Sequence, residues 1–366
     1  MVEEIWKKII RSQGFSFWRV VAFFLWLASF FYRFLFFMKK IASRKPVKLN
    51  IPVLSVGNIT VGGSGKTPMV AFISRFLLNE EIRVGIVSSG YGRTKKIAFV
   101  KPGYKVQKMD VHVTGDEVML LAHELPEAYF AVHESKTEAA MKLAETNKVD
   151  VIIIDDGYQH FKLERDINLV TYDAGVKKRL LKSFPYGILR EPVSAIRRAD
   201  VVVVTRSRFA KDLNLLMKRL QKIHPKADYY NAAFSITSLV SQGQSMPVKY
   251  LEDKSVFLFA GVGNFQVLKK QVFALSGDLD YAWELSDHQQ YNQTLLDEIK
   301  AMAEELDSDV IVTTSKDWVK LGNFDFGREI YYLDLSVDLN PGEEKLMESI
   351  MARLGLKNRR DDGTAV

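Results

Sequence analysis

The chain has 366 residues, of which 47% are hydrophobic and 26% charged. This composition is typical of a globular protein, and the length is enough for about two domains. The absence of cysteine excludes disulfides and thiolate metal sites. The net charge of +7 is compatible with anionic lipid, phosphate or nucleic acid as a partner. The net charge alone does not distinguish these partners, so the positions of the charges along the chain have to be considered.

The first feature along the chain is an apolar, aromatic stretch. Residues 20–32 contain no charged side chain, Arg33 interrupts the stretch, and residues 34–38 continue it. A membrane-spanning helix needs about 20 apolar residues, a length reached here only if Arg33 is included. Basic residues flank both ends, which favours a helix lying in the membrane interface. A spanning helix and a helix in the protein's own core stay as alternatives, and a cleaved signal peptide is not expected.

Residues 51–68 have the pattern of a phosphate-binding loop. An apolar β-like run leads into a glycine-rich turn, and a helical pattern follows over residues 69–78. Backbone N–H groups of such a turn can surround a phosphate, and the helix N-terminus adds partial positive charge. Lys66 would reach the β- and γ-phosphates, and the Thr67 hydroxyl would bind Mg²⁺. The expected nucleotide-binding set is Gly62, Gly63, Ser64, Gly65, Lys66 and Thr67.

One departure from the usual G-x-x-x-x-G-K-[ST] pattern occurs in this loop. Thr60 stands where the pattern has glycine. Glycine-rich turns after strands are common, so a purely structural turn is the alternative. The Gly-Lys-Thr ending favours nucleotide binding.

Strand and helix patterns alternate through the rest of the chain. Strands are expected at 83–88, 149–154, 167–172 and 201–205, and helices at 117–123 and 136–146. This β-α-β alternation predicts a doubly wound α/β sheet of the kind found in P-loop NTPases. Near residue 229 the pattern changes to short β-like runs, and a second, smaller α/β unit follows. Its expected elements are a strand at 255–260, a helix at 265–275 and a strand at 310–313.

These patterns predict a division of the chain into four parts. They are a membrane-associated helical segment at 1–45, a nucleotide-binding α/β domain at 46–229, a smaller α/β domain with a β linker at 230–355, and a polar tail at 356–366.

Two adjacent carboxylates end one of the buried strands. Asp155 and Asp156 come directly after three isoleucines. In phosphate-loop proteins, the carboxylate that orients magnesium usually occupies this place, although a capping aspartate can also end a strand. We expect one of the two to hold Mg²⁺ and the other to support it or to receive a proton.

Three further signals are weaker when taken alone. Asp116 opens a helical pattern after a glycine, where it could simply cap the helix. His288 follows Asp287, and a neighbouring acid can tune a histidine as a base, but a lone histidine is most often structural. Arg190 and Glu191 lie in a turn that could bind an anion.

Nine short motifs occur in a fixed order along the chain. They are GNITVGGSGKTP from residue 57, GYGR from 90, GDE from 115, DDGYQH from 155, LERD from 163, LREP from 189, FAGVGN from 259, SDHQQY from 286 and TSKD from 314. Together they resemble the tetraacyldisaccharide 4′-kinase family of lipid A biosynthesis, in which a threonine at position 60 is ordinary. Departures from the family's usual residues occur at Ser89, Val118, Lys136 and Tyr158. They concern the substrate more than the nucleotide site.

The resemblance implies an enzyme that transfers the γ-phosphoryl group of ATP to the 4′-hydroxyl of a tetraacyldisaccharide 1-phosphate, with Mg²⁺ as cofactor. It also implies two α/β/α domains, a two-stranded linker and attachment to the cytoplasmic face of the inner membrane, peripheral or monotopic. We expect a monomer and no nucleic-acid partner.

The family's functional residues fall on matching positions of this chain. The catalytic Asp–His pair falls on Asp116 and His288, and the magnesium acids fall on Asp155 and Asp156, with Glu191 as a further candidate. The phosphate loop adds Lys66 to the catalytic residues and Thr67 to the metal ligands. Candidates for binding the substrate are Arg93, Gln159, His160 and Arg190.

Two other classes of protein share part of these features. A regulatory ATPase or GTPase would have the loop, but a GTPase normally carries a guanine-reading N-K-x-D motif, and we expect none here. A peripheral membrane scaffold would account for the N-terminal segment but not for the loop with its paired aspartates.

Overall fold

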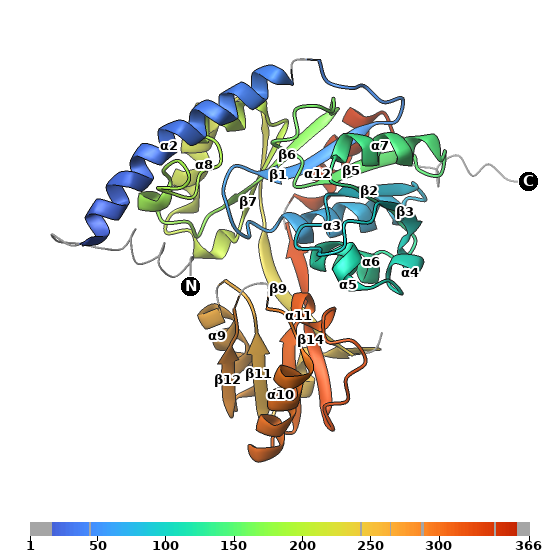
Figure 1. The fold of residues 1–366 in the computed structure, drawn as a ribbon, viewed down its shortest axis with the longest axis vertical. Coiled ribbons are helices and arrows are strands. Elements are labelled where there is room, and N and C mark those ends of the chain that lie inside the picture. The colour runs from blue at the N-terminus through green and yellow to red at the C-terminus, as the bar shows by residue number, and fades with distance from the viewer. Residues whose placement is uncertain are drawn as a thin grey trace, which may run out of the picture. The chain divides into compact units, whose positions relative to one another are not determined.

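The computed structural model describes residues 17–43, 45–241, 244–263, 265–286, 289–339 and 342–356. The chain forms an eight-stranded sheet in the order β3-β4-β2-β5-β1-β6-β7-β8 and a six-stranded sheet in the order β10-β9-β14-β13-β11-β12 (Figure 1). It divides into two compact units. The first consists of Met1–Ser88, Ser135–Ala233 and Asp338–Val366, and the second of Ser89–Glu134 and Phe234–Val337.

Both units are built from separate stretches of sequence. The chain leaves the first unit within β9 (Ala233–Ser241) and returns to it at the end of β14 (Glu329–Asp338), and these two strands are neighbours in the smaller sheet. The sequence patterns predict continuous domains instead, and the domain boundaries given above stay a prediction.

Six parallel strands form the centre of the first unit. Four of them are buried at every position, as expected for strands covered on both faces by helices. In sheet order the strands are β2 (Val84–Ser88), β5 (Val151–Asp155), β1 (Val53–Asn58), β6 (Ile167–Asp173), β7 (Val201–Thr205) and β8 (Asp228–Asn231). The helices are α2 (Phe17–Ala42), α3 (Lys66–Asn79), α7 (Lys136–Glu145), η1 (Lys178–Leu180), η2 (Val193–Arg198), η3 (Ser207–Phe209), α8 (Leu213–Ile223) and α12 (Glu343–Leu354).

The strand register brings the chemistry-bearing segments to one edge of this sheet. Val56 of β1 pairs with Asp155 of β5, and Asn58 pairs with Thr171 of β6. Because these strands are parallel, the loops that follow them meet at the carboxyl edge, where ligands bind in doubly wound sheets. The expected strands and helices of this half, and its α/β class, are confirmed, with ends that differ from the expectation by no more than three residues.

The second unit has its own buried sheet and core. Parallel strands β11, β13 and β14 carry the aromatic and aliphatic side chains of that core, including Phe257 and Phe259. Its elements are β3 (Phe99–Pro102), α4 (Gly103–Val106), α5 (Val111–Thr114), α6 (Asp116–Glu124), β4 (Tyr129–Val132), β9, β10 (Gln244–Pro247), η4 (Val248–Leu251), β11 (Val256–Ala260), α9 (Phe265–Ser276), β12 (Tyr281–Glu284), α10 (Gln293–Glu305), β13 (Val310–Thr314), α11 (Ser315–Trp318) and β14.

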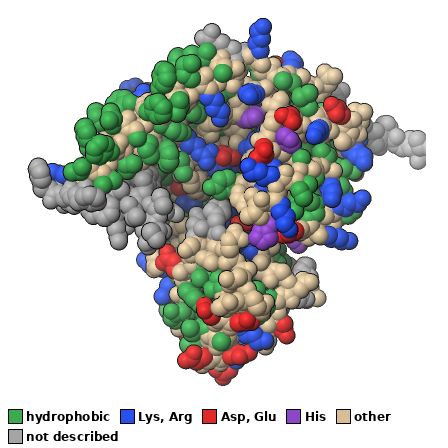
Figure 2. Space-filling model, viewed as in Figure 1, with side chains coloured by type: hydrophobic (Ala, Val, Ile, Leu, Met, Phe, Trp, Pro, Cys, Tyr) green, Lys and Arg blue, Asp and Glu red, His purple; other side chains and the backbone are tan. Residues whose placement is uncertain are grey.

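Helix α2 packs against the rest of the first unit through a narrow stripe of residues. Ser29 is buried, and the rings of Tyr32 and Phe36 lie 5.4 and 5.8 Å, centroid to centroid, from those of Phe184 and Phe161. The other faces are exposed, and Figure 2 shows hydrophobic side chains along the helix. They are Val20, Phe23, Phe24, Trp26, Leu27, Phe30, Phe31, Phe34, Leu35, Phe37 and Met38.

The exposure of α2 excludes one of the three alternatives for the N-terminal segment, the helix buried in the protein's own core. Among the described residues, α2 is the single helix whose length and composition would allow it to cross a membrane, and only 6% of its apolar window is buried. The alternative of a helix buried in the protein's own core is therefore wrong. A buried helix would have to cover its apolar side chains on all sides, and α2 covers one stripe.

The end of β1 packs closely against the loop after β5. A Cβ atom built on Gly57 would lie 2.6 Å from the Cβ atom of Tyr158 and 2.7 Å from its backbone nitrogen. Tyr158 is fully buried, and its hydroxyl donates to the carbonyl oxygen of Ala195 at 2.5 Å. Neither side of this contact can move aside easily, so glycine is required at position 57.

We expect Gly57→Ala to lower the free energy of unfolding by about 1–3 kcal/mol, the usual cost of overpacking a core. Urea-induced unfolding in one detergent buffer measures the effect. Gly63→Ala is the matched control, since a Cβ atom there would meet only the Arg206 guanidinium at 3.8 Å. Equal stability of the two variants would contradict the packing argument.

Candidate active site

The glycine-rich turn after β1 has the backbone of an anion-binding loop. Gly62 has a φ of +101° and Gly65 a φ of +79°, values that residues with a side chain rarely adopt. Gly65 also occupies the N-cap of α3, and no side chain caps that helix. The N–H groups of Lys66 and Thr67 open the helix and precede Pro68, which has no N–H, and the helix dipole favours an anion there.

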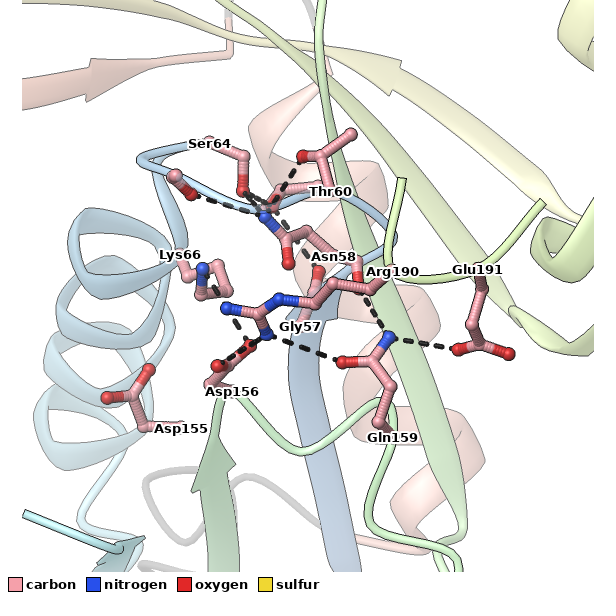
Figure 3. Close-up of polar contacts among 12 residues, drawn as sticks. Gly57, Asn58, Thr60, Ser64, Lys66, Asp155, Asp156, Gln159, Arg190 and Glu191 are labelled. Atoms are coloured by element: carbon pink, nitrogen blue, oxygen red, sulfur yellow. Dashed lines mark hydrogen bonds and ion pairs between the residues drawn. The ribbon is translucent and has the colours of Figure 1, made fainter. Parts of the chain in front are cut away.

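Side chains from neighbouring strands hold this loop in place (Figure 3). The Asn58 side-chain amide donates to Ser64 Oγ at 2.7 Å and to Thr60 Oγ1 at 3.3 Å. Ser64 Oγ also bonds Thr171 Oγ1 at 2.8 Å, and the Thr205 hydroxyl donates to the Ser64 carbonyl at 2.8 Å. Thr60, the departure from the usual loop pattern, therefore has a structural role as a partner of Asn58.

Arg206, which the sequence analysis does not single out, braces the loop from β7. Its guanidinium donates to the Gly63 carbonyl at 2.9 Å and to Asp173 Oδ2 at 2.9 Å. Arg206 directly follows β7, and Asp173 ends β6, so both lie at the carboxyl edge. The sequence does show that Asp173 and Arg206 follow two neighbouring strand patterns, and this is the feature from which their proximity could have been suspected.

The paired aspartates diverge where β5 ends. Asp155 is the last strand residue and is 4% exposed, whereas Asp156 has left the strand with a φ of +50°. A non-glycine residue in this conformation costs about 1 kcal/mol or more and is often found at functional sites. In Figure 3 the Asp156 carboxylate faces Arg190 and Lys66, whereas the Asp155 carboxylate points away from them.

Two cations contact the Asp156 carboxylate directly. The Arg190 guanidinium donates to both of its oxygens, at 2.8 and 3.0 Å, and Lys66 Nζ lies 3.7 Å from Oδ1. Burial raises the pKa of Asp156, but the charges of Lys66, Arg190 and Lys136 outweigh it and lower the pKa to about 2. Asp156 is therefore ionised at physiological pH.

Lys136, at the start of α7, holds the backbone beneath these carboxylates. Its Nζ donates to the carbonyl oxygens of Asp155 and Asp156, at 2.6 and 2.8 Å, and the residue is 9% exposed. Burial lowers the pKa of this amine, and the nearby carboxylates oppose that effect. In the sequence, Lys136 stands out only as a departure from the family pattern, because no local pattern indicates a contact with residues so distant in the chain.

Gln159 and Glu191 belong to a buried polar network beside Arg190. The Gln159 amide donates to the Asn58 carbonyl at 2.7 Å and to Glu191 Oε1 at 2.9 Å. Arg198 donates to the same Glu191 oxygen at 2.8 Å, and Glu191 is 4% exposed. Glu191 is thus ion-paired in this structure, and its assignment as a metal ligand stays a prediction.

His160 is held as a neutral side chain. Its Nε2 atom lies 2.8 Å from Thr137 Oγ1, and burial lowers its pKa to about 4. The Arg165 guanidinium donates to the carbonyl oxygens of Gly157 and His160, both at 3.1 Å, which fixes the loop that carries His160. Its assignment as a substrate contact also stays a prediction.

Asp116 and Arg93 lie in the second unit. The N-cap of α6 is Gly115, with a φ of +84°, and Asp116 is its first helical residue. The alternative in which Asp116 merely caps the helix is therefore wrong. Arg93 is 9% exposed and donates to the Ile97 carbonyl at 2.7 Å.

A buried lysine that the sequence analysis missed lies next to Asp116. Lys320 Nζ is 3.6 Å from Asp116 Oδ2 and 3.2 Å from Asp317 Oδ1, and its side chain is 5% exposed. Asp317, from the TSKD motif, also accepts from the Gly261 N–H at 3.0 Å and from the Thr314 hydroxyl at 2.7 Å. Lys320 therefore joins Asp116 to a buried polar centre. His288 lies outside the described residues.

The first unit thus collects one group of the expected site residues. It brings Lys66, Arg190 and Gln159 together around Asp156, with Asp155 beside it and Thr67 following Lys66 in α3. Among the described residues, no three His, Asp or Glu side chains cluster closely enough to hold a metal by themselves. A hydroxyl and two carboxylates are nevertheless the hard oxygen donors that Mg²⁺ takes alongside water and nucleotide phosphates, so the residues present fit this ion.

The expectation that the chain lacks an N-K-x-D motif is wrong. Residues 147–150 are N-K-V-D. This segment precedes β5, so it lies at the amino edge of the parallel sheet, opposite the carboxyl edge that carries the phosphate loop. The Asp150 carboxylate also pairs with Arg83, with donor distances of 2.7–3.0 Å. The motif therefore gives no support to a GTPase.

Comparison with known proteins extends these observations. The sequence profile described as tetraacyldisaccharide-1-P 4′-kinase matches residues 21–355. The tetraacyldisaccharide 4′-kinase of Pelobacter propionicus is 35% identical over 286 residues, which are 76% of each chain. That of Aquifex aeolicus is 31% identical over 311 residues, 83% of this chain and 88% of the relative.

A solved structure shows the same architecture. The crystal structure of LpxK from Aquifex aeolicus in complex with ATP superposes with a TM-score of 0.70 at 28% identity, and the match covers 90% of this chain and 97% of that one. By profile, sequence and structure, this chain belongs to the tetraacyldisaccharide-1-P 4′-kinase family.

Proposed function

We propose that this protein is a kinase that transfers the γ-phosphoryl group of ATP to the 4′-hydroxyl of a tetraacyldisaccharide 1-phosphate, a lipid A precursor. The observation that carries the proposal is the pre-formed phosphate loop with Lys66 and Arg190 beside it. The names of the relatives supply the acceptor, and the solved relative supplies ATP as the donor.

Positive charge at the loop is the main contribution of the first unit. Phosphoryl transfer places developing charge on the transferred group and its leaving oxygen, and fixed cations stabilise that charge in a site that excludes water. Before ATP binds, Asp156 balances Lys66 and Arg190. The triphosphate can take over part of this role, because Lys66 is the first residue of α3, at the helix N-terminus where the phosphates are expected.

Thr67, Asp155 and Asp156 are the residues that we assign to Mg²⁺. When bound, the ion neutralises charge on the phosphates and orients them. Lys136 fixes the backbone of both aspartates and so sets where their carboxylates can lie.

The acceptor hydroxyl needs a base, since a sugar hydroxyl is a poor nucleophile until its proton is removed. We assign this role to Asp116 with His288. On the side of Asp116, the buried ammonium of Lys320 lies 3.6 Å from the carboxylate and helps to fix its position.

The lipid substrate accounts for the exposed face of α2. An acylated disaccharide keeps its chains in a membrane, so the enzyme has to work at that surface. We assign α2 to the interface of the cytoplasmic leaflet, with its aromatic side chains in the lipid and the basic Lys39 and Lys40 at the headgroups. We keep a monomeric enzyme without a nucleic-acid partner as part of the proposal.

A regulatory ATPase is the competing function. It would hydrolyse ATP at the same loop without a lipid acceptor. A direct assay separates the two: ATP turnover that requires the tetraacyldisaccharide 1-phosphate supports the kinase, and turnover that ignores it supports the ATPase.

Lys66→Ala should lower the rate of phosphoryl transfer by about 10²-fold or more, because it removes a cation from the transferring group. Labelled phosphate transfer from ATP to the lipid acceptor gives the rate. Lys142→Ala, an exposed lysine of α7, is the control and should retain full activity. A Lys66→Ala enzyme with near-normal turnover would rule out the phosphate-loop mechanism.

Asp116→Ala and His288→Ala should each bind ATP nearly normally and transfer phosphate slowly. If the two residues act as one base system, the double variant should be about as slow as the slower single variant. Single-turnover kinetics with saturating ATP measure all three. Losses that multiply would show that the residues have separate roles.

Replacing Phe24, Phe31 and Leu35 together by glutamate should release the protein from vesicles and raise the apparent KM for the lipid, with ATP affinity unchanged. All three side chains are exposed, and they leave the Tyr32 and Phe36 contacts intact. Vesicle co-sedimentation and kinetics in mixed micelles are the measurements. Retained vesicle binding would show that α2 is not the membrane contact.

A further inference from the structure

A second basic segment lies beside α2 and has no role in the proposed reaction. Lys177, Lys178, Arg179 and Lys182 are all exposed, and Phe184 is 36% exposed. Residues 174–190 contain no acidic side chain. Within the described part of the chain, no carboxylate forms an ion pair with any of the four cations. Lys182 Nζ has a neutral neighbour, the ring of Tyr186, whose centre lies 4.6 Å away. The segment therefore presents uncompensated positive charge to its surroundings.

The basic segment is in contact with α2 itself. The ring of Phe184 packs edge-on against that of Tyr32, with their centroids 5.4 Å apart. Phe184 is positioned by its backbone N–H, which donates to the Leu189 carbonyl at 2.8 Å. The same aromatic residue thus joins the basic segment to the helix whose other faces are apolar and exposed.

The same stretch of chain continues into the phosphate site. The N–H of Val61 donates to the Ile188 carbonyl at 2.7 Å, and the N–H of Arg190 donates to the Ile59 carbonyl at 2.9 Å. Arg190 then holds Asp156. The stretch from residue 177 to residue 190 therefore runs from the exposed cations to the residues around the phosphate loop.

We propose that residues 177–184 form a second membrane-binding element, in which Lys177, Lys178, Arg179 and Lys182 bind the headgroups of anionic phospholipids. Charge complementarity carries the proposal, since basic clusters beside an apolar interfacial helix are attracted to an anionic membrane surface. The exposed edge of Phe184 enters the interface next to α2. This inference rests on the proposed membrane role of α2, and it adds a contact that α2 does not provide.

The test uses the full-length protein with all four cations replaced, K177Q/K178Q/R179Q/K182Q. Binding is measured by co-sedimentation with phosphatidylcholine vesicles and with vesicles that also contain phosphatidylglycerol, both free of lipid A precursor. We expect the variant to bind the neutral vesicles like the wild type and the anionic vesicles at least about tenfold more weakly, with a weaker dependence on salt.

A second variant controls for the loss of four charges. K101Q/K105Q/K269Q/K270Q removes four exposed lysines of the second unit. It should bind both kinds of vesicle like the wild type. Thermal unfolding and ATP binding of both variants show whether they are folded.

The outcomes separate this inference from the proposed function. Equal binding of the two quadruple variants to anionic vesicles would overturn the role of residues 177–184 and leave α2 untouched. A defect that arises only when the vesicles contain the tetraacyldisaccharide 1-phosphate would also overturn it, because the cations would then recognise substrate. Failure of the wild type to bind either vesicle would overturn the membrane role of α2 and, with it, this inference.

Discussion

The ion pairs of Asp156 with Lys66 and Arg190 organise the candidate nucleotide site. A carboxylate that is mostly buried is stable in its charged form only where cations surround it. Here the cations come from three segments: Lys66 from the start of α3, Arg190 from the stretch after η1, and Lys136 from α7. The single carboxylate thus fixes where these segments meet. It also holds the Lys66 and Arg190 side chains beside the glycine-rich loop.

Local pattern was enough to predict most of the first unit. The apolar runs predicted the buried strands. The Gly65-Lys66-Thr67 sequence after one such run predicted the loop and the start of α3. The paired aspartates were found for the same reason, since they end a strand that reads as buried on both faces. These features depend on residues within one strand, turn and helix, which a sequence displays directly.

Contacts between distant segments could not be predicted in this way. The pairs Lys136 with the Asp155 carbonyl, Arg206 with Asp173, and Lys320 with Asp116 depend on which loops share a sheet edge or a core. No periodicity of the sequence indicates such a pairing. The N-K-V-D segment at residues 147–150 is present in the sequence, but it precedes β5 and so lies at the edge of the sheet opposite the phosphate loop, where it cannot read a nucleotide bound at that loop.

One departure from the family pattern also has a physical explanation. Tyr158 replaces a phenylalanine, and its additional hydroxyl has a partner in the Ala195 carbonyl. The ring lies 4.6 Å from the Arg198 guanidinium, which also pairs with Glu191. A phenol in this buried place is tolerated because its polar atom is satisfied. Val118 is fully buried in α6, and nothing in the structure explains the choice of Ser89.

The hydrogen bonds that Asn58, Thr171 and Thr205 make to Ser64 bear on the thermodynamics of nucleotide binding. A glycine-rich turn left to itself would sample many backbone conformations, and a ligand would have to select one of them at an entropic cost. In this chain, hydrogen bonds from residues of the central sheet order the turn when the protein folds, before any ligand binds. A nucleotide that binds here therefore meets a turn that is already held in one conformation, and less of its binding free energy is lost to ordering the backbone.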